Sequence, residues 1–267
     1  MVDRLDFTLD SVSAYTTYSF ETHRILKQLM PSQFEVTFDP PQRPGLDQIS
    51  KKFHKTVLPV IGGITGTSYS DLISKIAAFS NWVYGDTDKE LIFNNQSTKY
   101  YNAQVIEPVL PILKSAVKAE LEVRFTLNDP FAYDTTASTD TQSSVTTNDT
   151  TYNVTNSGHY YCYPTATITF NQAQDHIYIQ NNTIEDCRFD ISQSFAAADV
   201  LIVNFKTGVV TLNGTETYVG IGVGGSELAE MIRLAFGDNA VNQMAIGTDD
   251  ATIDVDILLS WEKAYLS

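Results

Sequence analysis

A polar segment near the middle of the chain limits the folds that are open to it. Residues 134–157 read DTTASTDTQSSVTTNDTTYNVTNS, mostly Thr, Ser, Asn and Asp. Such a segment buries too little apolar surface to offset the entropy lost on ordering, so it is predicted to be a mobile loop or linker. The 267 residues are therefore predicted to form two domains, residues 1–134 and 158–267, joined by residues 135–157.

The balance of charge changes at the same place. Residues 1–128 carry 13 basic and 14 acidic side chains, whereas residues 129–267 carry 4 basic and 18 acidic side chains. An acidic surface repels phosphate, so direct binding to nucleic acid or to anionic lipid is disfavoured. Apolar runs fall short of the ~20 residues that span a bilayer, and the first residues lack the pattern of a signal peptide. A soluble protein without membrane insertion is expected.

Residues 69–84 are predicted to form a helix. Apolar residues recur on one face at helical spacing, namely Leu72, Ile76, Phe79 and Val83. Ser70 is the predicted N-cap, Asp71 suits the positive end of the helix dipole, and Gly85 is predicted to end the helix in the left-handed conformation.

Strand patterns surround this helix. Residues 55–64 are rich in strand-forming residues, residues 89–93 alternate in part, and residues 120–127 alternate fully between polar and apolar side chains. Full alternation is typical of a strand in an antiparallel sheet with one buried face. The first domain is therefore predicted to be an antiparallel β domain with one helix.

Short strand patterns also recur after the polar segment. They lie at residues 166–170, 177–179, 200–205, 209–212 and 253–257, and Asn213-Gly214 is a tight-turn dipeptide. Several short strands at this spacing favour a β-sandwich. Residues 226–236 carry apolar residues at helical spacing and are predicted to form a short helix across it. The predicted class is mainly β (α+β).

The chemistry-bearing residues do not assemble into a known catalytic pattern. Cys162 and Cys187 are interpreted as buried thiols, with a single disulfide as the alternative. The glycine run at residues 220–225 is interpreted as a flexible connection, since a nucleotide-binding loop needs a parallel βαβ unit. Asp254 and Asp256 are interpreted as residues on the solvent-exposed face of a strand rather than as the carboxylate pair of a glycosidase. The four histidines are interpreted as surface or hydrogen-bonded core residues. The chain is predicted not to be an enzyme and to need no cofactor or metal.

The order and spacing of several motifs resemble the distal tail proteins of long-tailed, non-contractile bacteriophages. In chain order they are Arg43-Pro44-Gly45-Leu46-Asp47, the strand at residues 55–60, the helix from Ile76 to Trp82, Leu91-Ile92, Tyr101-Asn102-Ala103, and Asp129-Pro130-Phe131-Ala132-Tyr133. The residues that carry the family motif are Pro44, Gly45, Trp82, Tyr101, Ala103, Asp129, Pro130 and Tyr133. Together the motifs cover most of residues 40–134, and the possible helix at residues 226–236 departs from the family pattern.

The resemblance implies a structural role in the virion. It implies a homo-hexameric ring at the tail tip, assembled in the host cytoplasm, with N-terminal domains around a channel and galectin-like sandwiches outside. The implied partners are the tail tube protein, the tail-tip hub protein and a receptor-binding protein. Contacts between copies are expected within residues 1–134, including the arm at residues 40–55, for which an ordinary hairpin loop is the alternative.

A lectin-like adhesion protein is the alternative function. It would bind glycan through exposed aromatic side chains on the sandwich, without needing a sixfold ring. Tyr160, Tyr161 and Trp261 are the predicted contacts of such a weak glycan site. Burial of these aromatic residues in the sheet is the competing interpretation.

Overall fold

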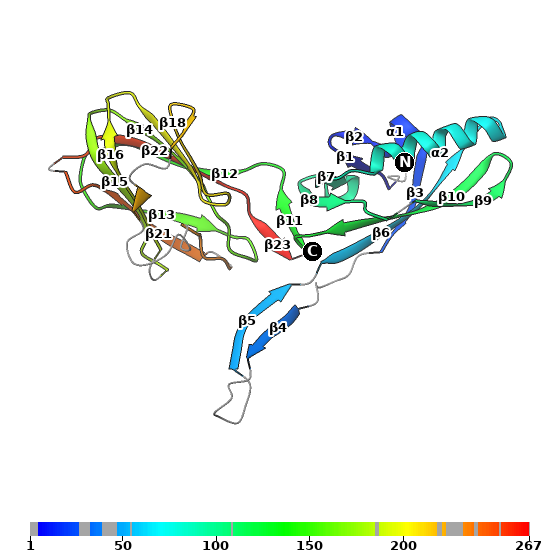
Figure 1. Ribbon diagram of the computed structural model, residues 1–267, viewed down its shortest axis with the longest axis horizontal. Helices are drawn as coiled ribbons and strands as arrows, with labels where there is room; N and C mark the ends of the chain where they lie inside the picture. The colour runs from blue at the N-terminus through cyan, green and yellow to red at the C-terminus, as the bar shows by residue number, and fades with distance from the viewer. Residues whose placement is uncertain are drawn as a thin grey trace. The chain divides into compact units, whose positions relative to one another are not determined.

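The computed structural model describes residues 5–26, 33–38, 47–53, 55–107, 109–184, 187–217, 221–222, 232–237, 240–250 and 252–266. The chain divides into two compact units, Met1–Thr135 with Leu266–Ser267, and Thr136–Tyr265 (Figure 1). Most of the described residues lie in antiparallel strands, so the predicted mainly-β class is confirmed.

The first unit is built on a twisted antiparallel sheet with the strand order β2-β1-β7-β8-β10-β6-β3. These strands span β1 Phe7–Leu9, β2 Val12–Ser13, β3 Phe20–Ile25, β6 Thr56–Thr65, β7 Lys89–Phe93, β8 Lys99–Gln104 and β10 Lys118–Leu127. β9 (Leu110–Ser115) pairs with β10, and β11 (Phe131–Asp134) pairs with β8. A separate two-stranded ladder joins β4 (Gln33–Phe38) to β5 (Asp47–Phe53).

The longest ladder of this sheet joins β10 to β6, with Leu127 opposite Thr56 and Lys118 opposite Thr65. The alternation predicted for β10 places Leu121 and Val123 in the core. β6 also packs closely against β3, where a Cβ atom on Gly62 would lie 2.4 Å from the Phe20 ring. Glycine at residue 62 therefore permits the close approach of β3.

The helix α2 (Tyr69–Val83) covers one face of this sheet (Figure 1). Its four predicted apolar residues are buried. Its N-cap is Ser68, whose hydroxyl accepts a hydrogen bond from the Asp71 amide, so the prediction of Ser70 was wrong by two residues. The predicted end was also wrong, because the C-cap is Tyr84 in an extended conformation. The shorter helices are α1 (Ala14–Tyr18) and the 3₁₀ helix η1 (Asn94–Gln96).

The second unit contains two antiparallel sheets. One has the order β12-β22-β14-β17-β18-β19 and the other β13-β21-β15-β16-β20. Their strands are β12 Ser138–Val145, β13 Thr150–Asn156, β14 Thr165–Phe170, β15 Gln174–Asn181, β16 Arg188–Phe195, β17 Val200–Asn204, β18 Val209–Leu212, β19 Thr215–Glu216, β20 Ile221–Gly222, β21 Ala240–Gly247 and β22 Val255–Trp261. The last strand, β23 (Ala264–Leu266), belongs to neither of these two sheets. One apolar cluster draws side chains from both sheets, including stacked Phe170 and Phe195. The predicted turn at Asn213-Gly214 is present, with φ values of 51° and 79°.

The polar segment at residues 134–157 is not a linker, and this prediction was wrong. Its residues form β12, which pairs with β22, and β13, which pairs with β21. Tyr152 and Val154 of β13 are buried, and the threonines beside them suit extended backbone. The segment thus supplies one strand to each sheet, because the apolar strands β21 and β22 provide the burial that it lacks.

The predicted helix at residues 226–236 is also corrected where the structure describes it. Residues 232–236 are not helical: Leu234 forms an antiparallel bridge with Cys162, and both residues are buried. Residues 226–231 lie outside the described residues, as does the glycine run except Ile221 and Gly222. The apolar spacing in this segment reflects burial of Ile232 and Leu234 in an extended segment.

Candidate interaction surfaces

The family-motif residues on β8 belong to the core of the first unit, and the motif residue on α2 is half-buried beside it. Trp82, at the end of α2, stacks on Tyr18 with ring centroids 4.6 Å apart. Tyr101 and Ala103 of β8 are buried, and burial raises the pKa of Tyr101. Pro44 and Gly45 lie outside the described residues.

The Asp129-Pro130-Tyr133 motif shapes the turn that follows β10. One carboxylate oxygen of Asp129 accepts a hydrogen bond from the Phe131 amide at 3.3 Å, and the other accepts one from the Tyr133 hydroxyl. The Tyr133 ring packs against Tyr100 of β8 with centroids 5.6 Å apart. These contacts are internal, so this part of the motif positions the chain after β10.

The aromatic residues predicted to contact glycan fall into two groups. Tyr160 and Tyr161 are half-buried and pack against Phe236, with the Arg233 guanidinium 4.9 Å from the Tyr161 ring centroid. Trp261 is 5% exposed and belongs to the core cluster of the sandwich. The buried position of Trp261 leaves little of its ring for a sugar to stack on.

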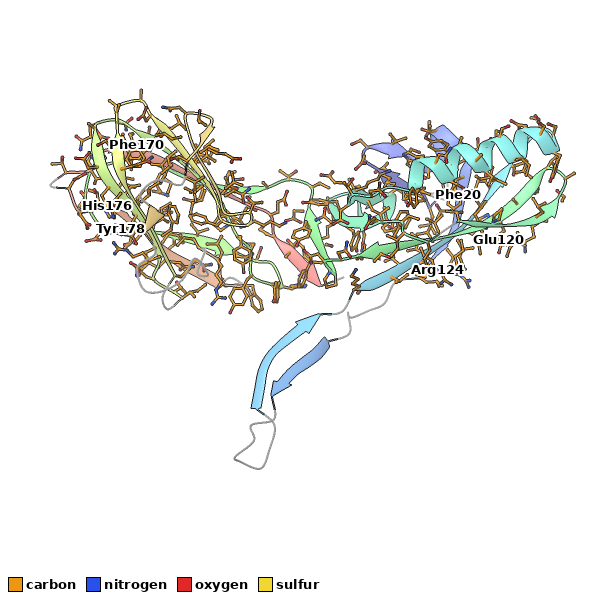
Figure 2. All side chains as sticks on the ribbon, viewed as in Figure 1. Phe20, Glu120, Arg124, Phe170, His176 and Tyr178 are labelled. Atoms are coloured by element: carbon orange, nitrogen blue, oxygen red, sulfur yellow. The ribbon has the colours of Figure 1, made fainter. Side chains whose placement is uncertain are left out.

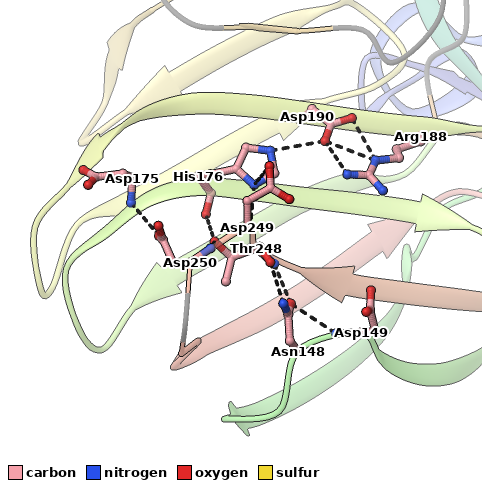
Figure 3. Close-up of polar contacts among 9 residues, drawn as sticks. All are labelled: Asn148, Asp149, Asp175, His176, Arg188, Asp190, Thr248, Asp249 and Asp250. Carbon is pink, nitrogen blue, oxygen red and sulfur yellow. Dashed lines mark hydrogen bonds and ion pairs between the residues drawn. The ribbon is translucent and has the colours of Figure 1, made fainter.

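A polar cluster that sequence analysis did not find lies at one end of the sandwich (Figure 3). His176 of β15 is 8% exposed, and its Nδ1 accepts a hydrogen bond from the Asp249 amide at 3.0 Å. Because an amide N–H can only donate, the imidazole proton is on Nε2, which lies 3.2 Å from Asp190 Oδ1. Arg188 donates to both carboxylate oxygens of Asp190 and lies 3.8 Å over the Tyr178 ring.

This cluster holds strand ends together, and its geometry does not match that of a hydrolase triad. The Thr248 hydroxyl donates to the His176 carbonyl at 2.7 Å, so it does not face the imidazole. Asn148 bonds the backbone of Thr248 through both atoms of its amide group. This cluster could have been predicted from two alternating patterns, His176-Ile177-Tyr178 and Arg188-Phe189-Asp190. In each pattern the polar or aromatic residues share one face, and the two patterns lie on neighbouring strands.

The two most exposed large apolar side chains in the described part of the first unit, Leu110 and Ile112, lie on β9 together with exposed Leu113. Leu110, Ile112 and Leu113 have exposed fractions of 70%, 58% and 49%. Leu110 and Ile112 face the same side as Ile61 of β6, because they lie opposite Glu122 and Glu120 of β10, and Glu122 lies opposite Ile61. We call Ile61, Leu110, Ile112 and Leu113 the β9 surface. The signal missed in the sequence was the unbroken apolar run at residues 109–113.

Charged side chains border the β9 surface (Figure 2, around Glu120 and Arg124). Arg124 Nη1 lies 3.2 Å from Glu107 and Arg124 Nε lies 2.8 Å from Glu122. Lys114 lies 3.5 Å from Glu120. The groove between these groups and the apolar residues has a volume of about 390 Å³ and is lined by Ile61, Glu107, Leu110, Ile112, Glu120, Leu121, Glu122 and Arg124.

In the described part of the chain, no helix is both long and apolar enough to cross a bilayer. Among the same residues, no group of three or more His, Cys, Asp or Glu side chains is placed to hold a metal ion. Cys162 and Cys187 are buried thiols that form no disulfide, and burial raises the pKa of Cys162 to about 12. A thiol with so high a pKa is a poor nucleophile at neutral pH.

Comparison with protein families identifies the class. Residues 14–127 match the phage tail protein RIFT-related domain, and residues 157–257 match the siphovirus-type tail component, C-terminal domain. The two matches fall on the two units of the fold, and both families are structural tail proteins. The chain belongs to the siphovirus distal tail, or baseplate hub, family.

A solved structure shares this fold along 97% of the chain. The crystal structure of SPP1 Dit (gp 19.1), described as a paradigm of the hub adsorption apparatus in phages that infect Gram-positive bacteria, aligns with a TM-score of 0.70 at 12% identity, covering 97% of this chain and 98% of that one. The phage P2 baseplate in its activated conformation with Ca gives a TM-score of 0.47 at 8% identity, over 97% of this chain and 98% of that one. None of the curated proteins matches the sequence.

Proposed function

We propose that this chain forms a homo-hexameric ring at the distal end of the phage tail tube. The ring connects the tube protein to the tail-tip hub protein and to host-recognition proteins. The family places the chain among structural tail and baseplate proteins. The observation that carries the proposal is the match of each unit to its own tail-protein family, together with a hub-protein fold along 97% of the chain.

A closed ring needs one head-to-tail contact that repeats until the last copy meets the first. The distribution of charge suits the first unit for that contact. Residues 1–135 carry 13 basic and 16 acidic side chains, whereas residues 136–265 carry 4 basic and 16 acidic side chains. Copies of the first unit pack with little repulsion, while the acidic sandwiches repel one another and stay solvated.

Imaging of the purified full-length protein by negative-stain electron microscopy, with its mass measured in solution, tests the proposal. Six copies of 29.6 kDa give a ring of about 178 kDa. We expect sixfold particles with a central channel at micromolar concentration and physiological salt. A 29.6 kDa monomer at every concentration and salt tested, alone or mixed with tail tubes, would contradict it.

A further inference from the structure

β9 is a strand that the described residues leave uncovered. All six of its residues are exposed, and in the described residues it pairs with β10 and with no other strand. An apolar strand at a sheet edge is a site of unwanted association unless it is covered. Pro111 lies within it, and proline removes a backbone donor, which disfavours extension of the sheet by simple strand addition. The strand is therefore suited to side-chain packing against a partner.

We propose that the β9 surface is the contact through which one copy of this chain joins the next. The inference rests on the proposed ring and names the residues that close it. Leu110 and Ile112 on one side of β9 and Leu113 on the other face insert into the neighbouring copy. An occupant that covers both faces accounts for the exposure of apolar residues on both.

The charges around the β9 surface favour a near-neutral occupant. Arg124 is held between Glu107 and Glu122, and Lys114 is paired with Glu120. These three carboxylates and two basic groups sum to a net charge of −1 and are already paired within the chain, so they offer little counter-charge to a strongly charged partner. The first unit of a second copy, with 13 basic and 16 acidic side chains, meets this requirement, whereas the acidic sandwich does not.

A head-to-tail ring also needs an acceptor surface elsewhere on the same unit. Leu26 and Val57 have exposed fractions of 43% and 44%, and they lie toward the opposite edge of the sheet from β9. The Leu26 amide donates to the Pro59 carbonyl at 3.0 Å, which places Leu26 beside β6. We assign Leu26 and Val57 to the acceptor surface, because contacts on opposite edges generate a ring rather than a two-fold dimer.

Two full-length double variants test this assignment. The first, Leu110→Ser with Ile112→Thr, removes the β9 contact, and the second, Leu26→Ser with Val57→Thr, removes the acceptor. Each is expected to raise the concentration for half-assembly at least about tenfold in analytical ultracentrifugation, because every contact of the ring loses buried apolar area. The matched control, Ile73→Thr with Leu258→Ser, replaces residues that are 41% and 37% exposed and is expected to assemble like the wild type.

Mixing the two double variants gives the sharper result. Each retains the surface that the other lacks, so an equimolar mixture is expected to form a 1:1 dimer of about 59 kDa, twice 29.6 kDa, and no ring. Hydrogen exchange of wild-type protein is expected to slow at residues 110–115 when it assembles. Near-UV circular dichroism and melting curves of the variants check that they are folded.

The outcomes separate this inference from the proposed function. If the first double variant forms rings as the wild-type protein does, and hydrogen exchange at residues 110–115 is unchanged by assembly, the role of β9 is overturned while the proposed ring stands. Rings of the second variant, or a mixture that stays monomeric, would overturn the acceptor surface. A wild-type protein that never assembles would overturn the ring itself.

Discussion

At the scale of single residues, buried asparagines hold an irregular segment of the sandwich. Asn242 Oδ1 accepts from the Ala235 amide at 2.7 Å, and its Nδ2 donates to the Ala235 carbonyl at 3.1 Å. Asn181 donates to the Arg233 carbonyl at 2.8 Å and Asn156 to the Leu234 carbonyl at 3.4 Å. These amide groups take the place of a neighbouring strand along residues 233–235. A segment predicted to be helical is thereby kept extended.

Replacing buried Asn242 by Ala should destabilise the sandwich by about 2–4 kcal/mol, because the part-buried backbone groups of Ala235 lose their partners. The chain has one tryptophan in each unit, so Trp261 fluorescence in a Trp82→Phe background reports urea unfolding of the sandwich. Asn153→Ala on the exposed side of β13 is the control and should change stability by less than about 0.5 kcal/mol. Equal effects of the two substitutions would contradict this role of Asn242.

At the scale of elements, α2 shows what local patterns predict well. Its buried face follows from the 3.6-residue period, which is a property of the helix alone. The first residue of α2 cannot be predicted from this period, because Ser68 and Ser70 are both suitable N-caps. Thr67 decides between them: its amide donates to Asp71 at 2.7 Å, and this hydrogen bond and Lys75 lower the pKa of Asp71. Thr67 lies in the loop that connects β6 to α2, so its position depends on the path of that loop.

Ser68→Ala should therefore destabilise the first unit by about 1 kcal/mol, because the Asp71 amide loses its acceptor. Ser70→Ala serves as the control and should cost less than about 0.5 kcal/mol, since alanine is favourable inside a helix. Trp82 fluorescence in a Trp261→Phe background measures both in urea. A larger loss of stability from Ser70→Ala than from Ser68→Ala would show that Ser70 is the N-cap instead.

At the scale of the whole molecule, the two units differ in charge more than in size. The sandwich carries 12 more acidic than basic side chains, and the first unit 3 more. Net charge of one sign destabilises a compact unit through repulsion among its own groups. Salt screens such repulsion, since the Debye length falls to about 10 Å at 0.1 M ionic strength.

Raising NaCl from about 0.02 M to about 0.5 M should therefore raise the melting temperature of the sandwich by a few degrees more than that of the first unit. The same single-tryptophan variants resolve the two transitions. Sodium chloride is used rather than sulfate, because sulfate also strengthens apolar burial in both units. Equal shifts in the two units would show that charge repulsion is not a significant term in the sandwich.

The sequence by itself determined the strands of alternating polarity, the buried face of α2 and the family motif of residues 40–134. These are local periods and spacings, and they do not depend on what lies beside them. Tertiary structure alone decided that the segment at residues 134–157 contains β12 and β13, that residues 232–236 are not helical, and that β9 is uncovered by the described residues. A polar strand is stable when an apolar neighbour supplies its burial, and a run of apolar residues is exposed when no described element packs against it. Both depend on contacts between residues far apart in the sequence, which no local pattern records.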